Sequence, residues 1–185
     1  MPPDLIEHRG AAAPDTPHAM KGSIPMSIQS VREYLEPLGL SDKILEFETS
    51  SATVELAAQA AGVIPARIAK SLSLMLPEGP ILLVAAGDAR IDNPRFKARF
   101  HAKARMLGAE EVAERIGHAV GGVCPFAVKG DVRTFLDVSL RRFDTVFPAC
   151  GSANSAIELS CAQLEAAAQG FAGWVDVCKD WQETT

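Results

Sequence analysis

The segment GVIPARIAKSLSLML, residues 62–76, decides the predicted fold. Pro65 opens one helical turn, because its fixed φ suits the first position of a helix. Residues 69–76 then take the period of a strand, in which successive side chains point to opposite faces. The sequence PEGP over 77–80 is typical of a turn, and the apolar run over 81–86 is the predicted returning strand. The segment therefore predicts a β-hairpin that follows a helical turn.

Helices and strands alternate irregularly on both sides of this hairpin. We expect helices that begin at Ser27, Thr53, Asn93, Ala109 and Ser160, with Asn93 as the N-cap of a basic helix. We expect further strands over residues 45–47, 132–138, 145–148, 156–159 and 174–178. No regular βαβ repeat occurs, so the pattern predicts a single α+β domain around a mixed sheet.

Length and composition restrict the class of protein. The chain has 185 residues, which corresponds to one domain at roughly 150 residues per domain. Apolar residues make up 48% of the chain, which excludes a wholly disordered protein. The chain has no uncharged apolar run long enough to span a membrane, so we expect no membrane partner. Residues 1–26 hold five of the 12 prolines and are predicted to be a flexible leader, which leaves 27–185 as the folded domain.

The cysteines favour a reduced environment. They lie at positions 124, 150, 161 and 178, and no C-x-x-C pair or finger-like histidine spacing accompanies them. We therefore expect neither a zinc site nor a disulfide framework. Reduced thiols are typical of a cytoplasmic protein.

Positive charge is concentrated in one segment of an acidic chain. The formal net charge is −5, but the segment from 90 to 105 alone carries +5, from Arg90, Arg95, Lys97, Arg99, Lys103 and Arg105 against Asp92. Such a segment would suit a phosphate backbone, and it would equally suit a solvated helix face.

Lys70 is the most informative single residue. In a strand over 69–76 it shares the more apolar face with Leu72 and Leu74. An unpaired buried ammonium costs several kcal/mol, so the amine must find a partner or reach water. Two interpretations remain: a lysine that extends its amine to solvent at a strand end, or a cation at the mouth of a pocket for an anionic or carbonyl oxygen.

The loop Gly121-Gly122-Val123-Cys124-Pro125 is a second candidate. Its glycines permit positive φ and close approach to a ligand, and successive N–H groups there would suit an anion or oxyanion. A tight connection between a helix and a strand explains the same residues. Neither a dinucleotide-binding nor a Walker A motif occurs, and nothing in the sequence fixes a geometry for Cys124 with His118 as a thiol nucleophile.

Two further polar groups have open interpretations. Asp137, in TFLDVSL, is either a turn-capping carboxylate or a pocket residue. The loop over 150–155, which contains Gly151, Ser152 and Asn154, is either a turn or a site lined by hydroxyls and an amide. The chain contains neither G-x-S-x-G nor H-E-x-x-H, the signatures of two common hydrolase classes.

Four segments in the same order resemble the YbaK/EbsC family of aminoacyl-tRNA deacylases, whose domain also occurs as the editing insertion of many bacterial prolyl-tRNA synthetases. They are GVIPARIAKSL (62–72), GGVCP (121–125), LDVSLRRFD (136–144) and GSANSAIEL (151–159). The resemblance extends from about Ile28 to Cys178. It implies a mixed sheet, partly closed like a barrel and flanked by helices.

The resemblance also implies a reaction and its residues. The family hydrolyses the ester between a wrong amino acid and the terminal adenosine of a tRNA, without a metal or cofactor. Lys70 falls on the family's essential lysine, and Gly121 and Gly122 fall on the loop whose amides face the ester. The other substrate-binding positions it implies are Ser51, Val123, Cys124, Pro125, Asp137, Gly151, Ser152 and Asn154.

Partners and substrates are implied more coarsely. The resemblance implies the acceptor end of tRNA as partner, with Arg95, Lys97 and Arg99 as tRNA contacts, and an aminoacyl-tRNA synthetase as a further partner. The family divides among alanine, cysteine, serine and threonine esters. Residues near Phe47, Ser51 and Val54 are expected to shape the amino-acid pocket.

Three functions are compatible with this sequence. The leading hypothesis is a free-standing editing hydrolase that acts in trans. The second is a non-catalytic tRNA- or synthetase-binding regulatory module of the same fold, which would not need Lys70. The third is a hydrolase or transferase for another small ester or nucleotide, which would not need an extended basic segment.

Overall fold

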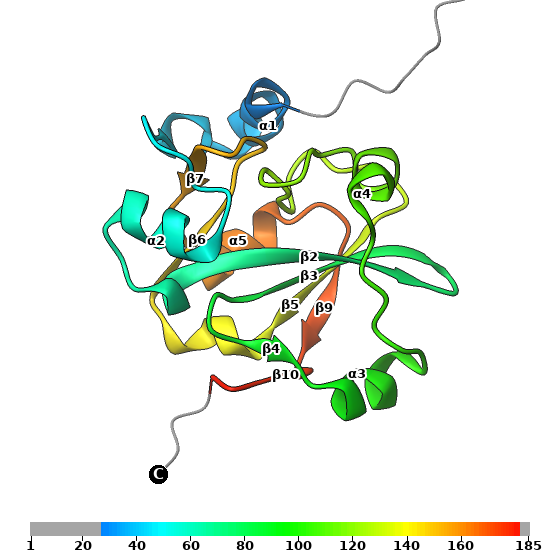
Figure 1. Ribbon diagram of the computed structural model, residues 1–185. Helices are drawn as coiled ribbons and strands as arrows, with labels where there is room; N and C mark the ends of the chain where they lie inside the picture. Colours follow the sequence, from blue (N-terminus) through cyan, green and yellow to red (C-terminus); the bar gives the residue numbers. More distant parts are fainter. Residues whose placement is uncertain (1–26, 182–185) are drawn as a thin grey trace, which may run out of the picture.

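The computed structural model describes residues 27–181 and shows one α+β domain (Figure 1). This confirms the predicted fold class. The predicted leader over 1–26 lies outside the described residues. Within 27–181, no helix has both the length and the apolar composition that crossing a membrane requires.

A six-stranded mixed sheet, curled into a half-barrel, forms the centre of the domain. Its strand order is β8-β6-β2-β3-β5-β9, with β8 (Leu159–Ser160), β6 (Thr145–Pro148), β2 (Ile68–Leu76), β3 (Gly79–Ala86), β5 (Arg133–Asp137) and β9 (Phe171–Val175). The predicted hairpin is β2 and β3, which pair antiparallel, while β6 lies parallel to β2 and β5 lies parallel to β3.

Two short sheets accompany the central one. Strand β1 (Ile44–Glu46) pairs with β7 (Ser155–Ile157), and β4 (Arg90–Ile91) pairs with β10 (Cys178–Lys179). The single strand predicted over 156–159 is therefore wrong in detail, because the chain leaves β1 after Ile157 and joins β6 from Leu159. The strand predicted over 174–178 is likewise divided, between the end of β9 and the start of β10.

Local capping signals explain where several helices begin and end. The α-helices of the described residues are α1 (Ile28–Leu35), α2 (Val54–Ala61), α3 (Asn93–Phe100), α4 (Ala109–Arg115) and α5 (Cys161–Ala167). Short 3-10 helices cover Glu36–Leu38, Ser41–Lys43, Pro65–Arg67 and Val138–Arg142. The Thr53 hydroxyl caps α2 as predicted, and the predicted capping box of Ser160 and Gln163 begins α5.

The predicted cap of the basic helix α3 is wrong by one residue. The Asp92 side chain accepts the N–H of Arg95 at 3.1 Å, so Asp92 is the N-cap and Asn93 is the first helical residue. Proline is tolerated in the first turn of a helix because those N–H groups have no helical acceptor. Pro94 therefore indicated the helix start without fixing which neighbour caps it.

The two faces of the β2–β3 hairpin are covered by different elements. Leu72 is in register with Leu83, and Leu83 with Phe135, so these side chains share one face, against which α3 packs through the 5.0 Å ring contact of Phe100 and Phe135. Ser71 is in register with Val84 on the opposite face. Figure 1 shows α3 and α4 on opposite sides of the hairpin.

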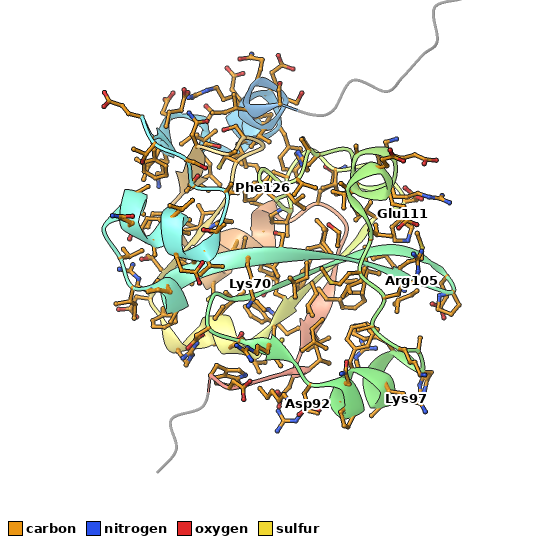
Figure 2. All side chains as sticks on the ribbon, in the orientation of Figure 1. Lys70, Asp92, Lys97, Arg105, Glu111 and Phe126 are labelled. Atoms are coloured by element: carbon orange, nitrogen blue, oxygen red, sulfur yellow. The ribbon has the colours of Figure 1, made fainter. Side chains whose placement is uncertain are left out.

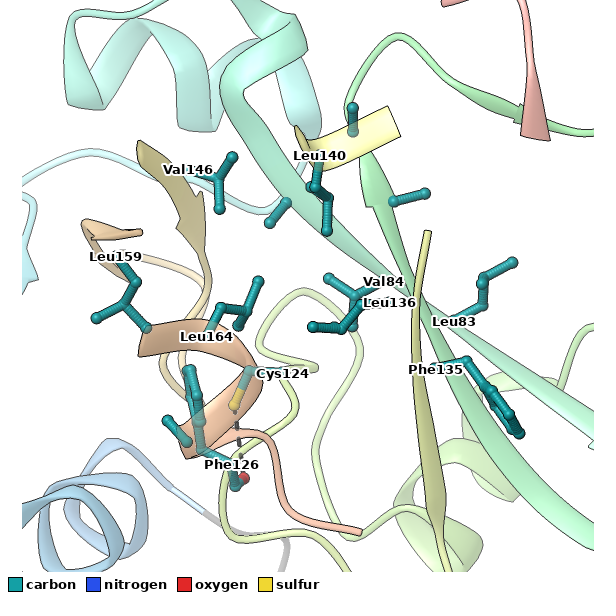
Figure 3. Packing of buried hydrophobic residues seen from close by; sticks show 14 of the residues in the cluster. Leu83, Val84, Cys124, Phe126, Phe135, Leu136, Leu140, Val146, Leu159 and Leu164 are labelled. Carbon is teal, nitrogen blue, oxygen red and sulfur yellow. Dashed lines mark hydrogen bonds between the residues drawn. The ribbon is translucent and has the colours of Figure 1, made fainter. Parts of the chain in front are cut away.

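The buried core continues on both faces of the sheet. Figure 3 shows Val84 and Leu136 turned toward Cys124 and Leu164, while Phe135 points to the other side. The register agrees, because Val84 pairs with Leu136. The face that carries Ser71 is therefore also the face approached by the loop over 118–125.

Candidate functional site

A cavity of about 260 Å³ lies on the Ser71 face of the hairpin. Its wall comes from β2, from the start of α2, from the loop over 118–125, from the segment before α4 and from the 149–156 segment. The lining residues used below are Ser51, Val54, Ala57, Ile68, Ala69, Lys70, Ser71, Met106, Val120, Gly121, Val123, Phe147 and Ser155. Segments far apart in the sequence thus meet at one site.

Glycines allow two loops to meet beside this cavity. A Cβ on Gly122 would lie 2.6 Å from the carbonyl carbon of Gly151 and 2.7 Å from the backbone nitrogen of Ser152. Gly121 has a φ of 93°, a conformation that side chains rarely adopt. The predicted glycine loop and the predicted polar loop are therefore in backbone contact.

The polar loop also holds the segment that leads into α2. The Asn154 side-chain amide donates to the Phe47 carbonyl at 3.0 Å, and the Ser51 N–H donates to the Ala153 carbonyl at 2.6 Å. The Ser152 hydroxyl lies 2.7 Å from the hydroxyl of Ser155. Gly151, Ser152 and Asn154 are not lining residues. Their loop instead holds the lining residue Ser51 through the Ala153 carbonyl.

The successive N–H groups predicted in the glycine loop are only partly available to a ligand. The Gly122 N–H donates to the Ala119 carbonyl at 3.1 Å and is already used within the turn. The N–H groups of Gly121 and Val123 have no hydrogen-bond acceptor among residues 27–181. Both residues line the cavity, and their amides are the candidates for an anionic or carbonyl oxygen.

Lys70 lines the cavity, but its amine is held on the other face of the sheet. Figure 2 shows its place on β2, and its side chain shares the face of Leu72. The amine donates to the carbonyls of Gly87, at 3.1 Å, and of Ala89, both in the turn after β3. Burial lowers the pKa of the amine below its usual value.

The charge of Lys70 remains without a close counter-ion. Within residues 27–181 no carboxylate lies within 4.0 Å of its amine, and the nearby Asp88 pairs with Arg142 instead, at 2.6 Å. Carbonyl oxygens accept hydrogen bonds but carry no full charge. An ammonium has three donors, so one N–H and the positive charge are left for an anion.

Cys124 and Pro125 lie behind the cavity wall. The Cys124 thiol is fully buried, 3.5 Å from the Nε2 of His118 and 3.6 Å from the Phe126 carbonyl. Burial raises the pKa of this thiol to about 12, so it is protonated near neutral pH. The Pro125 carbonyl accepts the Gln169 N–H at 2.8 Å and ties the loop to the end of α5.

Asp137 caps backbone groups away from the cavity. Its carboxylate is fully buried and accepts the N–H of Ser139 at 2.9 Å and the N–H of Val177 at 3.0 Å. Of the two interpretations of this residue, the geometry shows the capping role.

Within the described chain, 27–181, no three histidine, cysteine or acidic side chains gather closely enough to hold a metal ion.

The three predicted tRNA contacts are not brought to the cavity. Arg95, Lys97 and Arg99 belong to α3, on the opposite face of the hairpin (Figure 2). Arg95 forms an ion pair with Asp176 at 3.0 Å, and the Arg99 guanidinium lies 5.0 Å from the ring centre of Phe100. All three side chains are exposed, and within residues 27–181 Lys97 is the one of the three that forms neither an ion pair nor a ring contact.

Several lining residues escaped the sequence analysis. Of the residues expected to shape the pocket, Ser51 and Val54 line the cavity and Phe47 does not. Ser71, Met106 and Val120 line it without having been expected there. Alternation along β2 placed Ser71 opposite Lys70, but no sequence signal told which face would carry the cavity.

Known proteins that are similar to this chain cover most of the domain. A family model described as the aminoacyl-tRNA editing domain matches residues 48–167. The uncharacterized protein YwhH of Bacillus subtilis (strain 168) is 54% identical over 159 residues, which are 85% of this chain and 100% of that protein.

Two solved structures are similar as well. A crystal structure described as a candidate trans-editing enzyme for prolyl-tRNA synthetase has a TM-score of 0.74 at 28% identity, and the match covers 85% of this chain and 99% of that one. A scaffold used for computational grafting of linear epitopes has a TM-score of 0.73 at 26% identity, covering 82% and 96%.

Proposed function

The chain belongs to the aminoacyl-tRNA editing domain family, and we propose that it is a free-standing enzyme that removes a small, wrong amino acid from tRNA. The observation that carries the proposal is that Lys70 and Gly121, 51 positions apart in the sequence, line one cavity. The match of this chain to the whole of YwhH supports a domain that works as a separate protein.

The cavity wall limits the size of the amino acid. Ala57 and Ala69 leave space at the wall for a small side chain, and the bulkier lining residues Ile68 and Phe147 bound that space. Such a pocket excludes large side chains by overlap but separates similar small ones poorly. Alanine, serine, threonine and cysteine esters are therefore the proposed substrate class.

The chemistry is hydrolysis of the aminoacyl ester. A water oxygen attacks the carbonyl carbon, the bond to the ribose oxygen breaks, and that oxygen takes the proton. The Gly121 and Val123 amides would stabilise the negative charge that develops on the carbonyl oxygen. In the free protein the Lys70 amine is held by the carbonyls of Gly87 and Ala89 on the other face of the sheet. To bind the phosphate of the terminal nucleotide, the side chain would leave these carbonyls and turn toward the cavity, where its charge would meet the anion.

In this proposal the ribose hydroxyl next to the ester relays the proton: it accepts the proton of the attacking water while it donates its own proton to the leaving ribose oxygen. The buried, protonated thiol of Cys124 then has no nucleophilic role. The acceptor end of tRNA is the partner that the site needs, and an aminoacyl-tRNA synthetase is a further proposed partner that would supply the mischarged tRNA.

A panel of charged tRNAs tests the function. Purified full-length protein is offered alanyl-, seryl-, threonyl- and cysteinyl-tRNA, with the same tRNA carrying a large amino acid as the control. We expect catalysed release for at least one small amino acid and only background release for the large one. Tight tRNA binding without release of any amino acid would instead favour the non-catalytic regulatory module.

A further inference from the structure

Two buried hydroxyls in the cavity wall have no hydrogen-bond partner. They are the Oγ atoms of Ser51, on the segment before α2, and of Ser71, on β2. Ser51 is only 7% exposed. Other buried hydroxyls are bonded: Thr134 Oγ1 donates to the Gln169 carbonyl at 2.7 Å, and Ser139 Oγ accepts the Ala86 N–H at 3.1 Å.

An unpartnered buried hydroxyl is unfavourable in the free protein. It has lost its hydrogen bonds to bulk water without gaining one from the protein. Such groups are expected at a binding site, where a ligand can form the missing hydrogen bond. That hydrogen bond then contributes to the affinity for the ligand. Neither oxygen is reached by solvent in the free protein, so each hydroxyl would turn into the cavity by rotation about its Cα–Cβ bond to meet a polar group on the bound ligand.

The position of the two serines indicates which part of the substrate they meet. Val120 is 65% exposed and Met106 52% exposed, so these residues mark the mouth of the cavity, whereas Ala57 and Ala69 are buried and mark its floor. A volume of about 260 Å³ is smaller than the pockets that enclose drug-sized ligands. The acyl group fits inside, and the nucleoside remains at the mouth.

We propose that Ser51 and Ser71 bind a hydroxyl on the acyl side chain, so that seryl and threonyl esters are preferred over alanyl esters. The inference rests on the proposed deacylase function and adds its substrate preference. An alanyl group leaves both serine hydroxyls unpartnered. A seryl or threonyl hydroxyl can donate to one and accept from the other.

A thiol side chain is a weaker match for the same site. Sulfur is a weak donor and a weak acceptor, so a cysteinyl ester would gain less from the two hydroxyls than a seryl ester. The lining residues Ile68 and Phe147 are apolar, so an alkyl group of the substrate can pack against them. The threonyl methyl group is therefore tolerated at this wall.

The experiment compares one tRNA charged with serine or with alanine. The full-length protein is assayed for kcat/KM on both, and the measured quantity is the ratio of seryl to alanyl. Two satisfied hydrogen bonds predict a ratio of about ten or more. We expect Ser51→Ala and Ser71→Ala each to lower this ratio severalfold.

Ser155→Ala is the matched control. Ser155 also lines the cavity, but its hydroxyl lies 2.7 Å from the hydroxyl of Ser152 and is already bonded. Loss of the Ser155 hydroxyl is expected to change kcat/KM for seryl- and alanyl-tRNA by the same factor, so the ratio of the two stays at its wild-type value. Thermal unfolding adds a second readout: Ser71→Ala should melt at the same temperature as the wild type or higher, because an unsatisfied buried group is removed.

The outcomes separate the two proposals. If no aminoacyl-tRNA is hydrolysed, the deacylase function is wrong. If alanyl-tRNA is hydrolysed as well as or better than seryl- and threonyl-tRNA, the function stands and the selectivity proposal is overturned. A ratio that does not change in Ser51→Ala and Ser71→Ala overturns it equally.

Discussion

Gly122 lies against Gly151 so closely that a Cβ on Gly122 would be 2.6 Å from the Gly151 carbonyl carbon and 2.8 Å from its oxygen. Gly122→Ala should therefore push the two loops apart and displace Gly121 from the cavity. Inserting a methyl group into a close-packed contact costs about 1–3 kcal/mol of unfolding free energy. Denaturant unfolding should show a lower free energy of unfolding, and the deacylation assay should show a lower kcat/KM.

Gly130→Ala is the control for that variant. A Cβ on Gly130 would meet no atom within 4 Å. We expect its unfolding free energy to stay within about 0.5 kcal/mol of the wild type. If Gly122→Ala were as stable and as active as Gly130→Ala, the loop contact would not support the site.

Asp137 provides a test of a structural role. Its buried carboxylate accepts two backbone N–H groups, from Ser139 and from Val177. Asp137→Asn keeps the shape but replaces one acceptor oxygen with a donor. Because hydrogen bonds to charged groups contribute about 1.5–3 kcal/mol, we expect a loss of that size in urea unfolding. Lost deacylation with an unchanged unfolding midpoint would instead place this carboxylate in the site.

The buried thiols predict how stability depends on pH. Burial raises the pKa of Cys124 to about 12, above its ordinary value of 9.0. The folded state therefore keeps a proton that the unfolded state loses, so this stabilisation is full below pH 9 and is lost as pH rises toward 12. The expected slope from one such thiol is about 1.4 kcal/mol per pH unit.

Urea unfolding between pH 8 and pH 10.5 measures this slope. Cys124→Ala removes the titrating group, so its unfolding free energy should fall less steeply with pH than that of the wild type. Wild-type and variant curves that run parallel over this range would show that the Cys124 thiol is not responsible.

The basic helix α3 supplies a test of tRNA contact. Lys97 and Arg99 lie on the face of the β2–β3 hairpin opposite the cavity, so we expect Lys97→Glu with Arg99→Glu to change kcat/KM by less than about threefold. The affinity of the wild type and the double variant for tRNA, measured over a range of salt concentrations, tests whether α3 contacts tRNA. Weaker binding with a flatter salt dependence would show that tRNA phosphates reach α3.

The sequence was most predictive where structure depends on near neighbours. The strand over β2, the Thr53 cap of α2 and the capping box at Ser160 are set by residues a few positions apart, and all three are present. The order of four motifs indicated the family. The cap of α3 was misplaced, because Asp92 and Asn93 are both good capping residues beside a proline.

Contacts between distant segments could not be predicted in this way. One of the two N–H groups that Asp137 caps belongs to Val177, 40 positions later in the sequence. The carbonyls that hold Lys70 come from a turn whose position depends on the β2–β3 register. The unpartnered state of Ser51 and Ser71 is a property of the assembled wall, because any neighbouring acceptor would have satisfied them.

Lys70 carries the central claim, and a deacylation assay of Lys70→Ala tests it most directly. The control is Lys43→Ala, which removes an exposed amine outside the cavity wall. Loss of a charged contact to the substrate should lower kcat/KM on mischarged tRNA by about 10-fold to 100-fold, while Lys43→Ala retains wild-type turnover. Equal turnover by Lys70→Ala and wild-type protein would contradict the claim that this amine binds the substrate.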